Sequence, residues 1–169
     1  MDADALRQLQ APLKARYKEH PADARVTLRA RGSVRQATLS CQLEGGKAGV
    51  PAGLHQAAGG DGSQACSGDM LLEALVGCAG VTLAAVATAM GIELSQASVT
   101  AEGEVDFRGT LGVAKDVPVG FESIRVLFEI RTPTPDKLPK LIELTERYCV
   151  VFQTLSKPPR IELRVQQEA

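Results

Sequence analysis

Residues 71–90 read LLEALVGCAGVTLAAVATAM, an apolar stretch whose one charge is Glu73. It is long enough to span the hydrocarbon of a membrane. However, it is rich in Ala, Gly and Thr, and it lacks the Lys/Arg and aromatic flanks that membrane helices usually carry. A helix that is apolar all round is also typical of a protein core. We therefore predict a buried central helix over 68–90, with Ser67 as its N-cap and Gly91 as its stop, and no membrane partner.

The segments after this helix alternate between apolar and polar residues. Residues 98–108 and 121–131 show the period of two that is typical of half-buried strands, and an exposed loop is expected between them. A helix is predicted over 135–148, with a further helical turn over 149–156. Alternation of Ile, Leu and Val over 161–165 predicts a last strand.

The segments before the central helix predict a helix and a hairpin. Residues 3–19 carry a leucine stripe at helical spacing. Residues 25–31 and 35–43 predict paired strands, with Gly32-Ser33 as the turn. The stretch 44–67 is Gly-rich, and its residues 45–54 could hold a short strand. We therefore expect an α+β fold with one domain over 1–169, including an N-terminal helical extension over 1–22.

Composition excludes several classes of function. The chain has 169 residues, 44% of them apolar, and 19 Lys+Arg balance 20 Asp+Glu. Such a balance argues against a nucleic-acid partner, which usually requires a basic surface. The four cysteines and two histidines form no metal-binding motif, so no metal is expected. Residues 1–10 do not resemble a signal peptide, and we expect a cytoplasmic protein with reduced thiols.

The predicted central helix is also too long for one chain of this size to surround. At 1.5 Å per residue it would measure roughly 30 Å, about the width of a small domain. A sheet would cover only one of its sides. Because two-fold dimers are the commonest oligomers, we expect a homodimer with the central helices at its core.

Thiols are the reactive groups that stand out in such a chain. A thiolate can attack an oxidant and become a sulfenic acid, and a second thiol can then close a disulfide. The cysteines are Cys41, Cys66, Cys78 and Cys149. Composition alone does not say which pair would react.

Two segments resemble the OsmC/Ohr proteins, a family of thiol-dependent peroxidases and their relatives. Residues 68–78 (GDMLLEALVGC) resemble the opening of that family's central helix, which runs from an acid through apolar residues to Gly-Cys. Residues 149–155 (CVVFQTL) are similar to the family's Cys-Pro-Val-Ser-x-Thr-Leu stretch. Their separation, 71 residues from Cys78 to Cys149, matches as well.

The resemblance implies an intertwined homodimer, with antiparallel sheets wrapped around long buried helices and two sites at the subunit boundary. It implies that Cys78 attacks the peroxide and that Cys149 resolves the sulfenate as a disulfide. The substrate would be an organic hydroperoxide, the reductant a dithiol, and the role defence against oxidative stress, with no bound cofactor.

The same resemblance implies an arginine and an acid beside the attacking cysteine. Arg29, Arg31 and Arg35 are candidates for the arginine, and we choose Arg31. The family's acid position falls on Gly68 here, so Asp69 is taken as the acid. A second departure is Val150 in place of the family's proline. These departures motivate an alternative: a catalytically weak dimer that binds a small apolar ligand in the subunit cleft.

Overall fold

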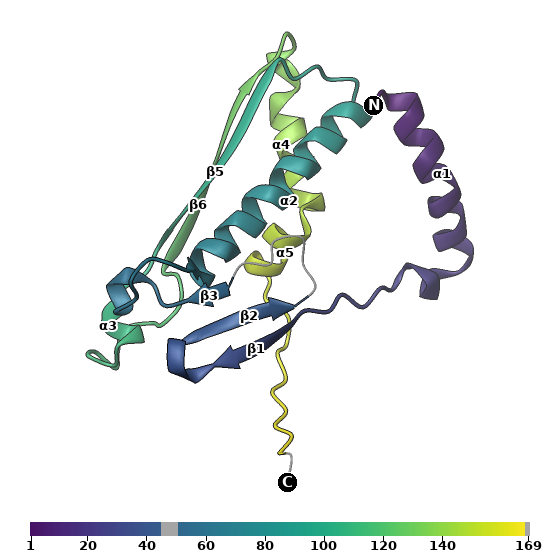
Figure 1. Cartoon of the computed structure of the whole chain (residues 1–169). Coiled ribbons are helices and arrows are strands. Elements are labelled where there is room, and N and C mark those ends of the chain that lie inside the picture. Colours follow the sequence, from purple (N-terminus) through teal and green to yellow (C-terminus); the bar gives the residue numbers. More distant parts are fainter. Residues whose placement is uncertain (45–50, 168–169) are drawn as a thin grey trace.

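The computed structural model describes residues 1–44 and 51–167, and its central element is the helix α2 (Ser67–Ala89) (Figure 1). The predicted helix is confirmed, although Cys66 rather than Ser67 occupies the N-cap position, without a side-chain cap. At the other end Gly91 adopts a left-handed φ of 62°, which glycine tolerates best. The Ile92 N–H then donates to the Ala87 carbonyl at 2.9 Å and closes the helix.

One face of α2 packs on a two-stranded antiparallel sheet of β5 (Gln96–Glu104) and β6 (Ser123–Arg131). The predicted alternation is confirmed, because every second residue of β6 is half-buried and the residues between are exposed. Facing the sheet and the helices beside it, α2 buries one residue in every turn: Leu75, Ala79, Leu83 and Ala87. The spacing of four matches the helical repeat, so these side chains form one stripe.

The predicted strand 98–108 ends early, at Glu104, because a short helix follows it. The Asp106 side chain accepts a hydrogen bond from the Arg108 N–H at 3.0 Å and caps α3 (Phe107–Thr110). The connection between β5 and β6 is therefore not wholly irregular. After β6 come the 3₁₀ turn η4 (Pro135–Lys137), α4 (Leu138–Tyr148) and α5 (Val150–Ser156), which confirm the predicted C-terminal helices.

A second sheet has the order β1 (Arg31–Arg35), β2 (Ser40–Glu44), β3 (Pro51–Gly53) and β4 (Ala65–Cys66). Its pairings are antiparallel, as predicted, except for the short parallel pair β3–β4. The predicted short strand is represented by β3, and residues 45–50 lie outside the described residues.

The hairpin exists, but its predicted turn is wrong. Gly32 and Ser33 lie inside β1, and the turn is the 3₁₀ segment η2 (Gln36–Thr38) followed by Leu39 in a left-handed conformation. Gly32 serves packing rather than turning, because a Cβ there would lie 2.6 Å from the Cys41 Sγ. Residues 25–30 are consequently left outside the strand.

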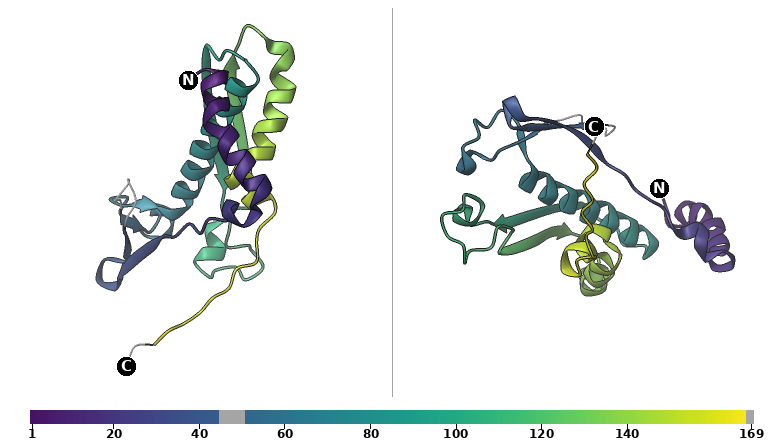
Figure 2. Two further views of the ribbon diagram at one scale, coloured as in Figure 1. Left: turned by 90° about the vertical axis from the view of Figure 1, so that its right-hand side faces the viewer. Right: turned by 90° about the horizontal axis from the view of Figure 1, so that it is seen from below.

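The two ends of the chain project from this body (Figures 1 and 2). Helix α1 (Ala3–Glu19) is as predicted, and the 3₁₀ turn η1 (Pro21–Ala24) follows it. At the C-terminus the predicted last strand over 161–165 is wrong for the single chain, because no neighbouring strand pairs with it within the described residues. Its Leu163 is 93% exposed.

The predicted burial of α2 is achieved on one side only. By length and composition the helix could cross a membrane, but only 22% of its most apolar window is buried within the chain. Val81, on the uncovered side, is 72% exposed. The sequence therefore predicted more burial than one copy of the chain provides.

Candidate functional site: a cysteine pair beside the central helix

The fold brings Cys78 and Cys149 into contact. Cys78 stands in the middle of α2, between the buried stripe and the uncovered side, and is half-buried. Cys149 is the residue between α4 and α5 and is only 1% exposed. It shares an apolar cluster with Leu75 and Ala79, against which Cys78 packs. All four cysteines lie in the described part of the chain and are free thiols.

A sharp corner in the backbone places Cys149 against α2. Helix α4 ends at Tyr148, Cys149 is extended (φ −74°, ψ 108°), and α5 begins at Val150. The Cys149 N–H still donates to the Thr145 carbonyl at 3.0 Å, and its own carbonyl accepts from the Gln153 N–H at 2.9 Å. Both main-chain groups of Cys149 are therefore satisfied, as burial requires.

The surroundings of the Cys78 sulfur favour its thiolate. Burial by itself would raise the pKa, but hydrogen bonds from the Val151 N–H, the Cys149 thiol, the Val150 N–H and the Thr82 hydroxyl outweigh it and hold the pKa of Cys78 below its ordinary value. Donors of this kind stabilise the charged form of an acceptor more than its neutral form. The thiolate is the nucleophilic form of a cysteine, and its formation is favoured at Cys78.

Cys149 has the opposite character. Burial raises the pKa of Cys149; the Phe152 N–H acts against this rise, while the hydrogen bond to Cys78 and the proximity of its negative charge add to it. The pair therefore consists of a half-buried thiol whose pKa is lowered and a buried thiol whose pKa is raised.

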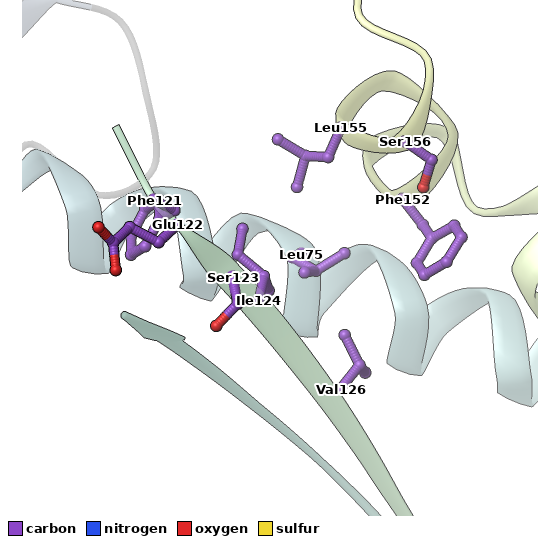
Figure 3. A pocket seen from close by; sticks show the side chains of 9 residues that line it. All are labelled: Leu75, Phe121, Glu122, Ser123, Ile124, Val126, Phe152, Leu155 and Ser156. Atoms are coloured by element: carbon purple, nitrogen blue, oxygen red, sulfur yellow. The ribbon is translucent and has the colours of Figure 1, made fainter. Parts of the chain in front are cut away.

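Apolar pockets lie close to the pair. One of them, about 330 Å³, is lined by α2, α5 and the start of β6 (Figure 3). Its apolar walls include Leu75, Ile124, Phe152 and Leu155, whereas Glu122 lies at its polar margin. A second, about 230 Å³, is lined by Cys149 itself, and so is a third, about 480 Å³, on the other side of the corner at Tyr148 and Val150. Because Phe152 lines the first two, its ring forms a shared wall between them.

The structure does not bring the other two predicted site residues to the cysteine pair. Arg31 is exposed on β1, in a hairpin at the margin of the fold (Figure 1). Asp69 is exposed in the first turn of α2, nine residues before Cys78 and therefore about 14 Å away along the helix axis. Within the described residues, neither is among the groups that shift the pKa of Cys78.

Sequence reasoning missed the donors around Cys78. Thr82 follows Cys78 by four residues on the same helix; its hydroxyl donates to the Cys78 carbonyl at 2.7 Å and is among the groups that lower the pKa of the thiol. That spacing could have pointed to Thr82, because residues four apart share a helix face. The main-chain N–H groups of Val150 and Val151 give no comparable signal, since every residue except proline has one.

A half-buried thiol with a lowered pKa beside a buried thiol with a raised pKa, set in an α+β fold, defines a class of two-cysteine protein. The profile of the family described as OsmC-like protein matches residues 60–164, which is more than half of the chain. The chain therefore belongs to the OsmC-like family.

Solved structures share the fold. An OsmC-like protein from Mycoplasma pneumoniae has a TM-score of 0.64 at 15% identity, covering 79% of this chain and 89% of its own. A Legionella pneumophila protein, described as an organic hydroperoxide resistance protein OsmC and predicted redox protein, has 0.61 at 12%, covering 79% and 93%. The Bacillus subtilis organic hydroperoxide resistance protein OhrB has 0.54 at 16%, covering 78% and 93%. A search of curated proteins finds no match.

Proposed function

We propose that this protein is a thiol-dependent peroxidase that reduces organic hydroperoxides, with Cys78 as the attacking and Cys149 as the resolving cysteine. The observation that carries the proposal is the contact between two free thiols whose pKa values are shifted in opposite directions. Membership of a family with neighbours named for organic hydroperoxide resistance supports it.

The reaction begins at the Cys78 thiolate. Its sulfur attacks the terminal oxygen of the hydroperoxide, the O–O bond breaks, and the alkoxide leaves and takes up a proton to become an alcohol. Cys78 is then a sulfenic acid. The Cys149 sulfur attacks it, the S–O bond breaks, and water leaves as the disulfide forms.

A dithiol reductant completes the cycle. Its thiolate attacks one sulfur of the Cys78–Cys149 disulfide, and its second thiol releases the resulting mixed disulfide. Both cysteines regain their protons, and the reductant leaves as a disulfide. The net change converts one hydroperoxide and two thiols to one alcohol, one water and one disulfide.

The apolar pockets beside the pair support an organic rather than an inorganic peroxide. Leu75 lines the pocket of about 330 Å³ one helical turn before Cys78, so an alkyl or aryl substituent could lie there while its peroxide group reaches the sulfur. Burial of such a group is favourable by about 25 cal/mol per Å² of apolar surface. Hydrogen peroxide has no apolar substituent to bury against these side chains, so its binding gains no such free energy.

We further propose that the active form is a homodimer. Val81 on α2 is 72% exposed and Leu163 in the C-terminal segment 93% exposed, which is unfavourable for a single copy in water. A second copy would cover these surfaces, and its own hairpin could bring Arg31 near the cysteine pair that the first copy's hairpin leaves open. If light scattering finds only monomers at micromolar concentration, the proposal of a homodimer is rejected.

The peroxidase is tested with cumene hydroperoxide and thiol counting on the reduced full chain. We expect two thiols per chain to disappear, and the same in Cys41→Ser, which leaves the pair intact. Cys78→Ser should lose none, and Cys149→Ser should stop at a sulfenic acid that dimedone traps. Unchanged thiols in the wild type, or equal loss in Cys78→Ser, reject the proposal.

A second candidate is a catalytically weak dimer that binds a small apolar ligand. The pockets of about 330 and 230 Å³ favour it, because both are apolar-walled and lie next to the pair. Native mass spectrometry of the purified protein would show a bound small molecule. Such a ligand together with no peroxide consumption favours this function; peroxide consumption without a ligand favours the peroxidase.

A further inference from the structure

The ring of Phe121 lies directly on a glycine of the neighbouring strand. Phe121 comes two residues before β6, and a Cβ on Gly103 of β5 would lie 2.4 Å from both Cδ1 and Cε1 of the ring. Carbon atoms in contact are normally about 3.5–4.0 Å apart. Only glycine therefore leaves room for the ring at this position of β5.

The tip of the same ring reaches the beginning of α2. A Cβ on Gly68 would lie 3.5 Å from the Phe121 Cζ and 3.5 Å from the Cys66 sulfur, which are ordinary contacts. The main chain next to the ring is held by the Glu122 N–H, which donates to the Glu104 carbonyl at 2.8 Å. The ring is therefore placed between β5 and α2.

Phe121 closes one end of the pocket of about 330 Å³. Figure 3 shows its ring at one end of this pocket and Phe152 at the other, with Leu75 between them. Gly68, beside the ring, precedes Cys78 by ten residues and is therefore about 15 Å from it along the axis of α2. Phe152 packs on the same apolar cluster as Cys78. The pocket thus extends along α2 from the neighbourhood of the cysteine pair to Phe121.

The side chains that line this pocket favour an uncharged occupant. Among the described residues that line it, Glu122 is the charged one, and it lies next to Phe121. A second negative charge, such as a carboxylate, would be repelled there and would also lose its hydration. An alkyl or aryl group has neither cost.

We propose that Phe121 is the specificity-determining residue of this pocket, which limits the length of the uncharged organic substituent that can be bound, and that Gly103 is the positioning residue that gives its ring room. The inference rests on the proposed function in taking the bound group as the substituent of a hydroperoxide whose reacting end lies at Cys78. A substituent that has reached the ring cannot bury any further methylene.

The probes are the straight-chain primary alcohols from butanol to decanol, which resemble the alcohol product and do not react with thiols. Each is added to the reduced full chain, and its protection of Cys78 from iodoacetamide is followed by peptide mass spectrometry. We expect the affinity to rise about fourfold with each methylene that the pocket buries, and to stop rising within this series. An affinity that rises to the end of the series in the wild type, or no protection by any alcohol, overturns the proposal.

The Phe121→Ala variant removes the ring that closes the pocket. We expect the affinity to go on rising beyond the chain length at which the wild type stops, because the space of the ring becomes available. Phe107→Ala is the matched control, since it removes a ring of the same size from the same β5–β6 connection, where that ring stacks on His55 outside the pocket. A limit that is the same in Phe121→Ala and in the wild type overturns the proposal.

Gly103→Ala tests the positioning role. Its added Cβ displaces the ring, so the limiting chain length should change, whereas the same substitution in Phe121→Ala meets no ring and should change nothing. Gly120→Ala is the control, because its Cβ would meet nothing within 4 Å. Equal effects of Gly103→Ala in the two backgrounds reject the role of Gly103. If only the double variant folds, the clash with the ring is confirmed; if neither folds, the role is rejected.

Protection from alkylation requires no peroxide, so the two proposals fail separately. A length limit that depends on Phe121, together with no peroxide consumption by the wild type, supports the role of Phe121 and rejects the peroxidase. Peroxide consumption without such a limit rejects the role of Phe121 and leaves the peroxidase standing.

Discussion

The inner part of this molecule, around α2, buries its apolar side chains, whereas the outer segments near the two ends of the chain leave theirs exposed. Around α2, the sheet of β5 and β6 and the helices α4 and α5 cover side chains as fully as Leu141, which is 0% exposed, and Leu83, at 2%. In the outer segments, by contrast, Leu28 is 87% exposed and Val165 97%. The two parts have similar residue types but very different surroundings.

The difference teaches that only the inner part is complete within one chain. Its helices and strands find their neighbours within the same chain, whereas the segments 25–30 and 157–167 are extended without a pairing strand among the described residues. A strand gains its hydrogen bonds only from a neighbour. The outer part therefore depends on contacts that the single chain does not supply.

The largest expected effect is at the centre of the inner part. Leu83→Ala should lower the free energy of unfolding by about 2–5 kcal/mol, through lost burial and the cavity left behind. Urea denaturation followed by circular dichroism measures it. Leu111→Ala, in an exposed loop, is the control and should stay within about 0.5 kcal/mol. Similar losses in the two variants would contradict the comparison.

The next effect concerns the outer part. Leu163→Asp places a charge in the alternating C-terminal segment and should convert dimers to monomers at micromolar concentration, because a buried unpaired charge is costly. Light scattering gives the mass. Glu162→Gln, the neighbouring residue with the opposite orientation, should leave it unchanged. A dimer that survives Leu163→Asp would exclude this segment from the interface.

A third prediction concerns the cysteines of the inner part. Because the pKa of Cys78 is lowered and that of Cys149 is raised, iodoacetamide should modify Cys78 first, with a rate that levels off at a lower pH. As pH rises above the Cys78 pKa and toward that of Cys149, the selectivity should diminish, because Cys149 then ionises as well. Peptide mass spectrometry after timed alkylation distinguishes the sites. Faster modification of Cys149 would reverse the assigned roles.

The smallest effect is expected on the outer face of β6. Arg125 pairs with Glu104 at 2.7 Å and Glu102 at 3.7 Å, but all three side chains are exposed and solvent screens them. Arg125→Ala should leave the urea midpoint unresolved from that of the wild type. Val126→Ala, whose side chain points inward, should lower it measurably. An Arg125→Ala loss as large as that of Val126→Ala would show that ion pairs stabilise this sheet.

Sequence patterns predicted the regular elements well where their period was long and clear. The helices at 3–19 and 68–90 and the strand at 121–131 are found within two residues of their predicted bounds. The hairpin was displaced because Gly32 reads as a turn residue, although it serves close packing against Cys41. The last strand was predicted from an alternation that is real but has no partner in this chain.

For the candidate site, the family resemblance selected the two cysteines that the fold brings together. It did not predict the corner at Cys149 or the hydrogen bond from the Gln153 side chain to the Glu146 carbonyl. Arg31 and Asp69 remain predictions, since both lie away from the pair within one chain. The motif indicates which residue types are present, but it does not indicate how the main-chain groups are oriented.

By itself the sequence determined the local elements, because hydrophobic period and caps act over a few residues. Only the tertiary structure decided which two of four thiols meet and which of them loses its proton more readily. Those properties depend on burial and on hydrogen bonds from segments 71 residues apart in the chain, and such contacts exist only once the segments have packed together.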